Sequence, residues 1–228
     1  MRSLTWLSPQ DEPDSFPAPE QALEDPAGLL AAGGDLSPAR LLAAYRRGIF
    51  PWYSPGQPVL WWSPDPRAVL FPEEFRCARS LAKTLRNGGF RSAVNWNFSA
   101  IIDGCAAPRP HTQGTWITEE MRDAYLQLHR LGYAHSIESY RDEVLVGGLY
   151  GVRLGSVFFG ESMFSRERDA SKVALAHLVS LCRANGIVVI DCQLASRHLH
   201  SLGSRSIARS QFLSLLGEHV GMRPQAFA

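Results

Sequence analysis

The sequence lacks any apolar run long enough to cross a membrane. Its longest runs, such as residues 187–190, cover only a few positions, whereas a membrane-spanning helix needs about 20. The amino-terminal residues turn to proline and acidic side chains before a signal peptide could form. The sequence also lacks a strong net charge, because its 23 Lys and Arg residues are balanced by 22 Asp and Glu residues. This balance excludes a polycationic protein and an acidic tail. We expect a cytoplasmic protein in which any charged binding surface is local.

Motifs for metal binding and nucleophilic hydrolysis are absent too. The four cysteines form no CxxC pair, so we expect free, buried thiols. The seven histidines show no HExxH spacing, and His198 and His200 have no acidic or cysteine partner in register. No metal site is therefore expected. Neither a GxSxG elbow nor a Walker A loop occurs, which gives little support to serine hydrolase or nucleoside triphosphate chemistry.

The 228 residues fit one large domain or a large and a small one, at about 150 residues per domain. Residues 1–66 are rich in proline, glycine and aromatic residues, and we expect them to form a small domain with one helix. Ser37 can cap this helix, Pro38 suits its first turn and Gly48 ends it. Prolines around the aromatic residues that follow favour extended backbone: Trp52, Tyr53, Trp61 and Trp62.

Residues 67–228 are expected to form the second domain, which begins with a helix over residues 72–87. Its spacing gathers apolar residues on one face and basic residues on a neighbouring strip: Arg76, Arg79, Lys83 and Arg86. Such a strip is either an ordinary solvated helix face or a nucleic-acid surface, and the spacing alone leaves both interpretations open.

The middle of the second domain predicts a mixed sheet. After an amphipathic helix capped by Thr118, three strand-like runs follow at residues 134–140, 144–152 and 156–164, with loops short enough to force an antiparallel meander. A helix capped by Asp169 or Ser171 and a strand over residues 186–195 come next. This order of elements predicts an α/β fold with a mixed sheet.

Two strands carry polar residues where apolar ones are expected. Alternation in the last strand puts Asp191 and Gln193 on one face, at the carboxyl end, where open α/β sheets bind ligands. These two residues could equally hydrogen-bond the next loop. Glu161 lies in an aromatic strand beside Gly160, a bulge site that can aim a side chain into an active site. The alternative is a salt-bridged glutamate on an edge strand.

Three groups of residues together resemble the bacterial leucyl/phenylalanyl-tRNA–protein transferase family: GGDLSPARLLAAYRRGIFPWYSPGQPVLWWSPDPRAVL, GTWIT, and LVGGLYGVRLGSVFFGESMFSRERDASKVAL followed by IDCQ. The resemblance implies a small amino-terminal domain and a carboxyl-terminal domain of the GCN5-related acetyltransferase type. The loop SRERDASK contains no glycine, whereas an acetyl-CoA enzyme of that fold grips the pyrophosphate with a glycine-containing loop. We therefore expect no coenzyme A and no other cofactor.

The activity that the resemblance implies is transfer of Leu, Phe or, less readily, Met from aminoacyl-tRNA to the α-amino group of proteins that begin with Arg or Lys. The new amino-terminal residue marks the protein for degradation. By analogy, Gln193 orients the attacking amine through its side-chain oxygen, and Asp191 polarises or positions that amide. Glu161 matches the family's active-site glutamate, and with Asp191 it would make the acceptor side negative.

The resemblance also places the donor. Its side chain would lie among the aromatic residues Trp52, Trp116 and Phe158, together with Leu178, which stands where family members carry Phe and leaves the Leu-versus-Phe preference open. Arg79, Lys83 and Arg86 would contact the acceptor stem of tRNA. The segment SLGSRSIARSQF departs from the family pattern, so its role is open. Two alternatives remain: another amide-forming aminoacyl transferase, and a non-catalytic adaptor for amino-terminal Arg or Lys. A monomer is expected.

Overall fold

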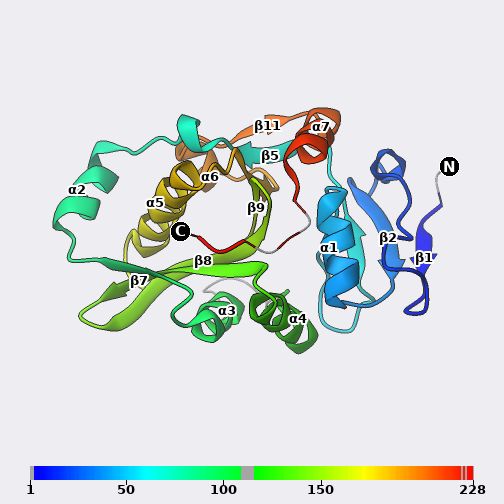
Figure 1. Ribbon diagram of the computed structural model, residues 1–228, viewed down its shortest axis with the longest axis horizontal. Coiled ribbons are helices and arrows are strands. Elements are labelled where there is room, and N and C mark those ends of the chain that lie inside the picture. Colours follow the sequence, from blue (N-terminus) through cyan, green and yellow to red (C-terminus); the bar gives the residue numbers. More distant parts are fainter. Residues whose placement is uncertain (1–2, 109–115, 222, 224, 228) are drawn as a thin grey trace.

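The computed structural model describes residues 3–108, 116–221, 223 and 225–227, and these residues form two sheets (Figure 1). A four-stranded sheet has the order β1-β2-β4-β3, and a seven-stranded sheet has the order β11-β5-β10-β9-β8-β7-β6. The large sheet is antiparallel except for the parallel pair β9–β10. The predicted α/β fold with a mixed sheet is thus confirmed. Residues Gly114 and Thr115 of the GTWIT string lie outside the described residues.

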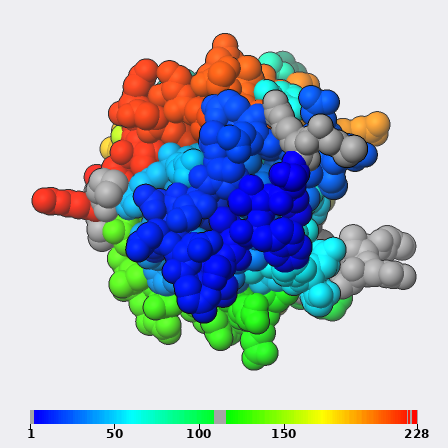
Figure 2. Space-filling view, turned by 90° about the vertical axis from the view of Figure 1, so that its right-hand side faces the viewer, coloured from blue at the N-terminus to red at the C-terminus, as the bar shows by residue number. Residues whose placement is uncertain are grey.

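The small sheet lies within residues 1–66, as its strands show: β1 (Thr5–Leu7), β2 (Leu29–Gly33), β3 (Phe50–Pro51) and β4 (Leu60–Trp62). A short 3₁₀ helix (Pro19–Gln21) and the helix α1 (Pro38–Arg46) belong to the same segment. Helix α1 begins as predicted, because the Ser37 hydroxyl accepts a hydrogen bond from the Arg40 N–H at 3.4 Å. Figure 2 shows this segment, in blue to cyan, in the middle of one face of the molecule.

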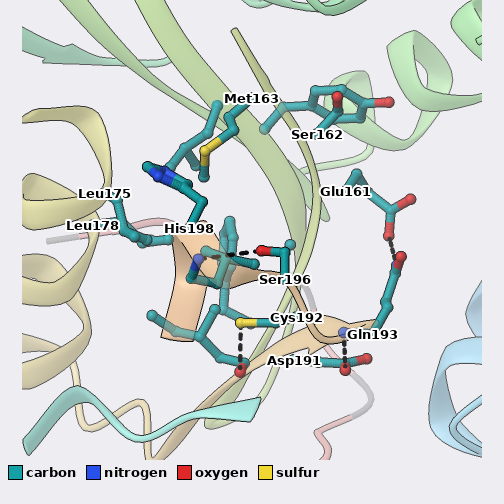
Figure 3. Close-up of a pocket in the computed structure, with 16 residues that line it drawn as sticks. Glu161, Ser162, Met163, Leu175, Leu178, Asp191, Cys192, Gln193, Ser196 and His198 are labelled. Atoms are coloured by element: carbon teal, nitrogen blue, oxygen red, sulfur yellow. Dashed lines mark hydrogen bonds between the residues drawn. The ribbon is translucent and has the colours of Figure 1, made fainter. Parts of the chain in front are cut away.

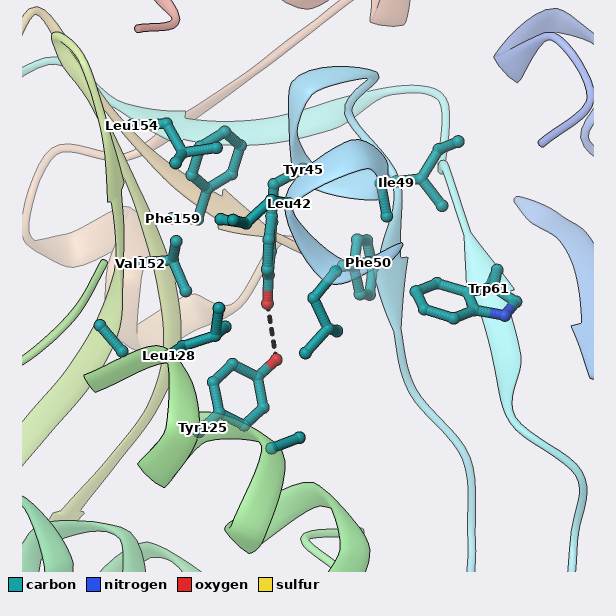
Figure 4. Packing of buried hydrophobic residues seen from close by; sticks show 14 of the residues in the cluster. Leu42, Tyr45, Ile49, Phe50, Trp61, Tyr125, Leu128, Val152, Leu154 and Phe159 are labelled. Carbon is teal, nitrogen blue, oxygen red and sulfur yellow. Dashed lines mark hydrogen bonds between the residues drawn. The ribbon is translucent and has the colours of Figure 1, made fainter. Parts of the chain in front are cut away.

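The two sheets share one hydrophobic core. Trp61 of the small sheet, Tyr45 of α1 and Phe159 of the large sheet belong to the same cluster of buried residues (Figure 4). The first strand of the large sheet, β5 (Arg67–Leu70), directly follows the expected boundary at residue 66. Because the core continues across that boundary, packing of the amino-terminal segment affects the large sheet directly.

The centre of the large sheet is the predicted meander of β7 (Ala134–Arg141), β8 (Val144–Leu154) and β9 (Val157–Ser165). Consecutive residues of β8 face opposite ways. Leu149 packs with Leu175 and Leu178 of α5 (Ala170–Ala184). Tyr150 packs against Tyr125 of α4 (Glu119–Arg130), on the side that α3 (Phe98–Ala106) also covers. After α5, strand β10 (Val189–Gln193) returns parallel to β9.

The prediction of one helix over residues 72–87 is wrong for the first half of this range. Residues Pro72–Glu74 form a 3₁₀ helix, and α2 begins only at Arg79 and runs to Asn87. Between them the chain is extended, because the Arg76 N–H donates to the Leu202 carbonyl at 2.9 Å instead of to its own helix. Arg76 therefore leaves the predicted basic strip, while Arg79, Lys83 and Arg86 stay on α2.

Other details also differ from expectation. Asp169 precedes α5 in a left-handed conformation and does not cap it; its carboxylate instead accepts from Lys172 at 2.7 Å. Of the four free cysteines, Cys105 and Cys182 are buried, Cys192 is half-buried and Cys77 is exposed, so the prediction of buried thiols holds for two. Several further elements carried no predicted signal, among them β6 (Arg91–Val94), α3, α6 (Arg197–Ser201), β11 (Arg205–Ile207) and α7 (Arg209–His219).

Candidate active site

A cavity opens where β9 and β10 separate. Their last paired residues are Phe159 and Asp191; beyond them the two strands diverge around a cavity of about 320 Å³ (Figure 3). This size is in the range of small-ligand sites. Both strands contribute to the walls, as do α5 and α6, and the lining includes Glu161, Asp191, Gln193, Phe158 and Leu178. The structure thus brings together five of the residues singled out from the sequence.

Glu161 is the extra residue of a bulge, as the neighbouring glycine predicted. Along β8, Tyr150 pairs with Ser162 and Gly151 pairs with Gly160, so Glu161 has no partner of its own. A bulge turns the side chain out of the regular alternation. Glu161 thereby reaches the cavity and faces Gln193 (Figure 3).

Gln193 does not follow the strict alternation predicted for its strand. The register between β10 and β5 shifts between Asp191 and Gln193, and Gln193 has a left-handed φ of 62°. Its backbone N–H donates to Asp191 Oδ1 at 2.9 Å. This local turn, held by the carboxylate two residues earlier, sets the direction of the Gln193 side chain.

The Gln193 amide has a defined orientation. Its Nε2 donates to Glu161 Oε1 at 2.9 Å. The amide thus turns its NH₂ group toward Glu161 and its carbonyl oxygen Oε1 away. No donor among the described residues contacts that oxygen, so Oε1 can accept a hydrogen bond from a bound molecule.

Two buried tyrosines hold the other side of Glu161. The Tyr45 hydroxyl donates to Oε1 at 2.8 Å, the Tyr125 hydroxyl contacts Oε2 at 2.6 Å, and the two hydroxyls lie 2.6 Å apart (Figure 4). These three contacts need three protons, whereas the hydroxyls supply two. A proton on Glu161 completes the set. Consistently, burial is the largest cause that raises the pKa of Glu161 to about 7. The hydrogen bonds from Tyr125 and Tyr45 lower it, and the smaller effects of the Asp191 and Arg67 charges oppose each other.

Asp191 faces a cation that the sequence did not predict. Arg67 Nε lies 2.8 Å from Oδ1 and Nη2 lies 2.6 Å from Oδ2, and both side chains are buried. Oδ1 also accepts the backbone N–H of Gln193. Asp191 therefore contacts the backbone of Gln193 and not its side-chain amide. Sequence spacing gave no signal for Arg67, Tyr45 or Tyr125, because each comes from an element far away along the chain.

The apolar part of the cavity includes two of the four predicted donor-pocket residues. Phe158 and Leu178 are buried and line the wall together with other apolar side chains: Leu149, Met163, Leu175 and Ile190. Trp52 and Trp116 do not line this cavity. Trp52 is 41% exposed and packs against Trp62, with ring centroids 5.6 Å apart, and Trp116 packs against the edge of the shared core.

Leu178→Phe tests whether this wall selects the side chain that enters the cavity. For the two donors that the resemblance implies, the larger ring removes space, so we expect phenylalanyl transfer to fall relative to leucyl transfer by about tenfold, since a few carbons in an apolar pocket change specificity by about 1 to 3 kcal/mol. Competition between the two labelled aminoacyl-tRNAs measures the ratio. Leu178→Met, which conserves volume, is the control and should leave it unchanged. Equal slowing of both donors would show that Leu178 is only structural.

The basic residues of α2 lie on the surface. Arg79, Lys83 and Arg86 are exposed, and no carboxylate among the described residues pairs with any of them. Helix α2 packs beside α5, whose residues line the cavity. Three positive charges without an ion-pair partner among the described residues are thus exposed on a helix that contacts α5. Within the described parts of the chain, no cluster of three metal-ligating side chains occurs and no helix is long and apolar enough to span a bilayer.

Comparison with known proteins identifies the family. Residues 69–217 match the model described as leucyl/phenylalanyl-tRNA protein transferase, and residues 34–65 match that of its N-terminal domain. The chain is 57% identical over 217 residues to the leucyl/phenylalanyl-tRNA–protein transferase of Pseudomonas entomophila, covering 95% of both chains. It is 56% identical over 223 residues to that of Stutzerimonas stutzeri, covering 98% of this chain and 97% of the relative.

The similarity to solved structures is much weaker. A GCN5-related N-acetyltransferase from Kribbella flavida matches with a TM-score of 0.42 and 13% identity, covering 75% of this chain and 61% of that one. The L-PGS structure from Bacillus licheniformis matches with a TM-score of 0.39 and 12% identity, over 68% of this chain and 50% of that one. The family models and the long, highly identical relatives decide the question: this chain belongs to the leucyl/phenylalanyl-tRNA–protein transferase family.

Proposed function

We propose that the protein transfers Leu, Phe or, less readily, Met from aminoacyl-tRNA to the α-amino group of proteins that begin with Arg or Lys, and so creates a degradation signal. The observation that carries this proposal is the direction of the Gln193 amide, whose carbonyl oxygen has no partner among the described residues. It lies between an apolar wall, suited to the donor side chain, and Glu161, suited to a cationic acceptor.

The reaction depends on alignment of the amine with the ester more than on a strong base. The donor is an activated ester, and an N-terminal amine with a pKa of roughly 7.7 to 8.0 is already partly neutral at pH 7. Gln193 Oε1 accepts an N–H of this amine and directs its lone pair toward the ester carbonyl. The amine nitrogen forms the new amide bond, the ester C–O bond breaks, and the amine proton ends on the ribose oxygen, directly or through water. Holding the reactants in this geometry supplies much of the acceleration.

Glu161 is the group that faces the cationic acceptor. Its Oε1 already accepts from Tyr45 and Gln193. Among the described residues Oε2 contacts only Tyr125, so it keeps one position for a further donor. A guanidinium or ammonium group placed there would stabilise the ionised carboxylate and displace its proton. We infer that selection for Arg or Lys depends on this carboxylate more than on Asp191, whose charge Arg67 balances.

The donor reaches the cavity from tRNA and not from coenzyme A. At the amino end of α5 two of the N–H groups already have protein acceptors, because Ala170 donates to Glu167 O and Ser171 to Ser165 Oγ, both at 3.2 Å. The Asp169 carboxylate stands beside them, and the loop contains no glycine. These features do not fit a pyrophosphate. We propose a cofactor-free, monomeric enzyme of the cytoplasm, where charged tRNA is available.

Replacing Arg79, Lys83 and Arg86 together with alanine tests the tRNA surface. Phosphate contacts read no sequence and depend on salt. In a plot of the logarithm of the leucyl-tRNA association constant against the logarithm of the salt concentration, the slope should become shallower by about 2 to 3 units. Each phosphate contact contributes somewhat less than one unit to this slope. Filter binding at several salt concentrations measures it. Arg130→Ala, an exposed arginine on α4, should leave the slope unchanged, and an unaltered slope in the triple variant would remove α2 from the interface.

One experiment tests the function itself: purified protein and radiolabelled leucyl-tRNA are mixed with an Arg-initiated peptide and, in a parallel reaction, with a small amine. Label in the peptide supports the proposal. Label in a small amine but not in the peptide would indicate another amide-forming aminoacyl transferase. Peptide binding without any transfer of label would indicate a non-catalytic adaptor.

A further inference from the structure

Arg67 makes a buried, two-pronged ion pair at the base of the site. It stands at the start of β5, next to β10. Its guanidinium group donates from Nε to Asp191 Oδ1 at 2.8 Å and from Nη2 to Oδ2 at 2.6 Å. The exposed fractions of the two side chains are only 1% and 0%. This parallel geometry is the strongest and most directional form of an arginine–carboxylate contact.

The same guanidinium group reaches parts of the chain that lie far from β5 in sequence. Nη1 donates to the Gly48 carbonyl at 3.0 Å, just after α1. The guanidinium carbon lies 4.7 Å from the ring centroid of Phe50 in β3 and 4.7 Å from that of Phe212 in α7. Arg67 therefore connects the amino-terminal segment and the last helix with strand β10.

This contact decides what Asp191 can do. Oδ1 holds both Arg67 Nε and the Gln193 backbone N–H, and Oδ2 holds Arg67 Nη2. The carboxylate is thus fully buried and charge-compensated, and a general base needs access to the proton that it removes. Asp191 instead fixes the left-handed turn at Gln193, from which the amide reaches Glu161.

We propose that Arg67 is a positioning residue for the transfer reaction: together with Asp191 it forms a neutral unit that holds the Gln193 turn. The Asp191 charge is then neutralised by Arg67 and does not bind the substrate. The inference rests on the proposed function. It assigns recognition of the cationic acceptor to Glu161, because the Asp191–Arg67 unit carries no net charge.

A comparison of single and double variants tests the role. Removing one member of a buried ion pair leaves the other charge uncompensated, whereas removing both is far better tolerated. We expect Arg67→Met and Asp191→Asn each to lower kcat by about 100-fold, the effect of a small misplacement in an active site. In the double variant Arg67→Met/Asp191→Asn, the introduced amide oxygen can still accept the Gln193 N–H. This variant should recover kcat to within about tenfold of the unsubstituted protein.

Substrate affinities separate positioning from loss of the fold. Leucyl-tRNA should bind Arg67→Met as it binds the unsubstituted protein, with the loss confined to kcat. If Arg67→Met does not fold, Arg67→Lys is used; it keeps the charge without the two-pronged contact, and kcat should fall by about tenfold at unchanged tRNA affinity. An unchanged kcat in either variant overturns the proposal, as does a double variant as slow as Asp191→Asn. If the unsubstituted protein transfers no label, the proposed function fails instead.

Discussion

Gln193→Ala is expected to lower kcat for leucyl transfer by about 100-fold, because the amine loses the acceptor that aligns it with the ester. Affinity for leucyl-tRNA should not change, since we propose that the donor side chain contacts the opposite, apolar wall of the cavity. Single-turnover transfer from prebound, radiolabelled leucyl-tRNA to an Arg-initiated peptide measures the chemical step without interference from product release.

Leu194→Ala is the matched control for Gln193→Ala. Leu194 is the next residue along the chain, is 46% exposed and does not line the cavity, so its truncation should leave the single-turnover rate unaltered. Full activity in Gln193→Ala would show that the amide takes no part in aligning the amine. Loss of tRNA affinity in that variant would assign Gln193 to the donor side instead.

Glu161→Gln should weaken binding of an Arg-initiated peptide by about 10- to 100-fold, the value of a charge-assisted hydrogen bond of roughly 1.5 to 3 kcal/mol. Leucyl-tRNA binding should be little affected. The pKa of Glu161 is raised to about 7, so the carboxylate is mostly protonated below that pH and mostly ionised above it. Peptide affinity of the unsubstituted protein should therefore increase as the pH rises through 7, and this increase should be absent in Glu161→Gln.

Isothermal titration with the peptide at pH 6, 7 and 8 measures both effects. The unsubstituted protein should also release a proton on binding near pH 7, visible as a dependence of the binding heat on the buffer. Asp191→Asn in the Arg67→Met background, which removes the other carboxylate of the cavity without leaving a lone charge, should keep the pH dependence. Equal loss of peptide and tRNA affinity in Glu161→Gln would argue against a role in acceptor recognition.

Local patterns in the sequence predicted the elements that bear the site. Alternating apolar residues with short turns predicted the three-stranded meander, and Gly160 beside Glu161 predicted the bulge that turns this carboxylate into the cavity. Periodicity failed at residues 72–78, where a tertiary hydrogen bond from Arg76 to Leu202 replaces the helix. The prediction from alternating side chains failed at Gln193, because the Asp191 carboxylate accepts the Gln193 backbone N–H and imposes a turn on the strand end.

The partners of the site residues could not be predicted from local patterns. Tyr45 lies in a helix of the amino-terminal segment and Tyr125 in α4, and they meet Glu161 only because the two sheets share one core. Arg67 meets Asp191 because β5 inserts beside β10 in the sheet. These contacts join residues far apart along the chain, so they depend on topology and leave no short-range signal.

A crystal structure with a leucyl-adenosine in which an amide replaces the ester tests the central claim most directly. We predict that the leucyl side chain lies between Phe158 and Leu178, with the carbonyl carbon facing the space next to Gln193 Oε1. A leucyl group bound instead on the surface formed by Trp52 and Trp62, away from Gln193, would contradict the account.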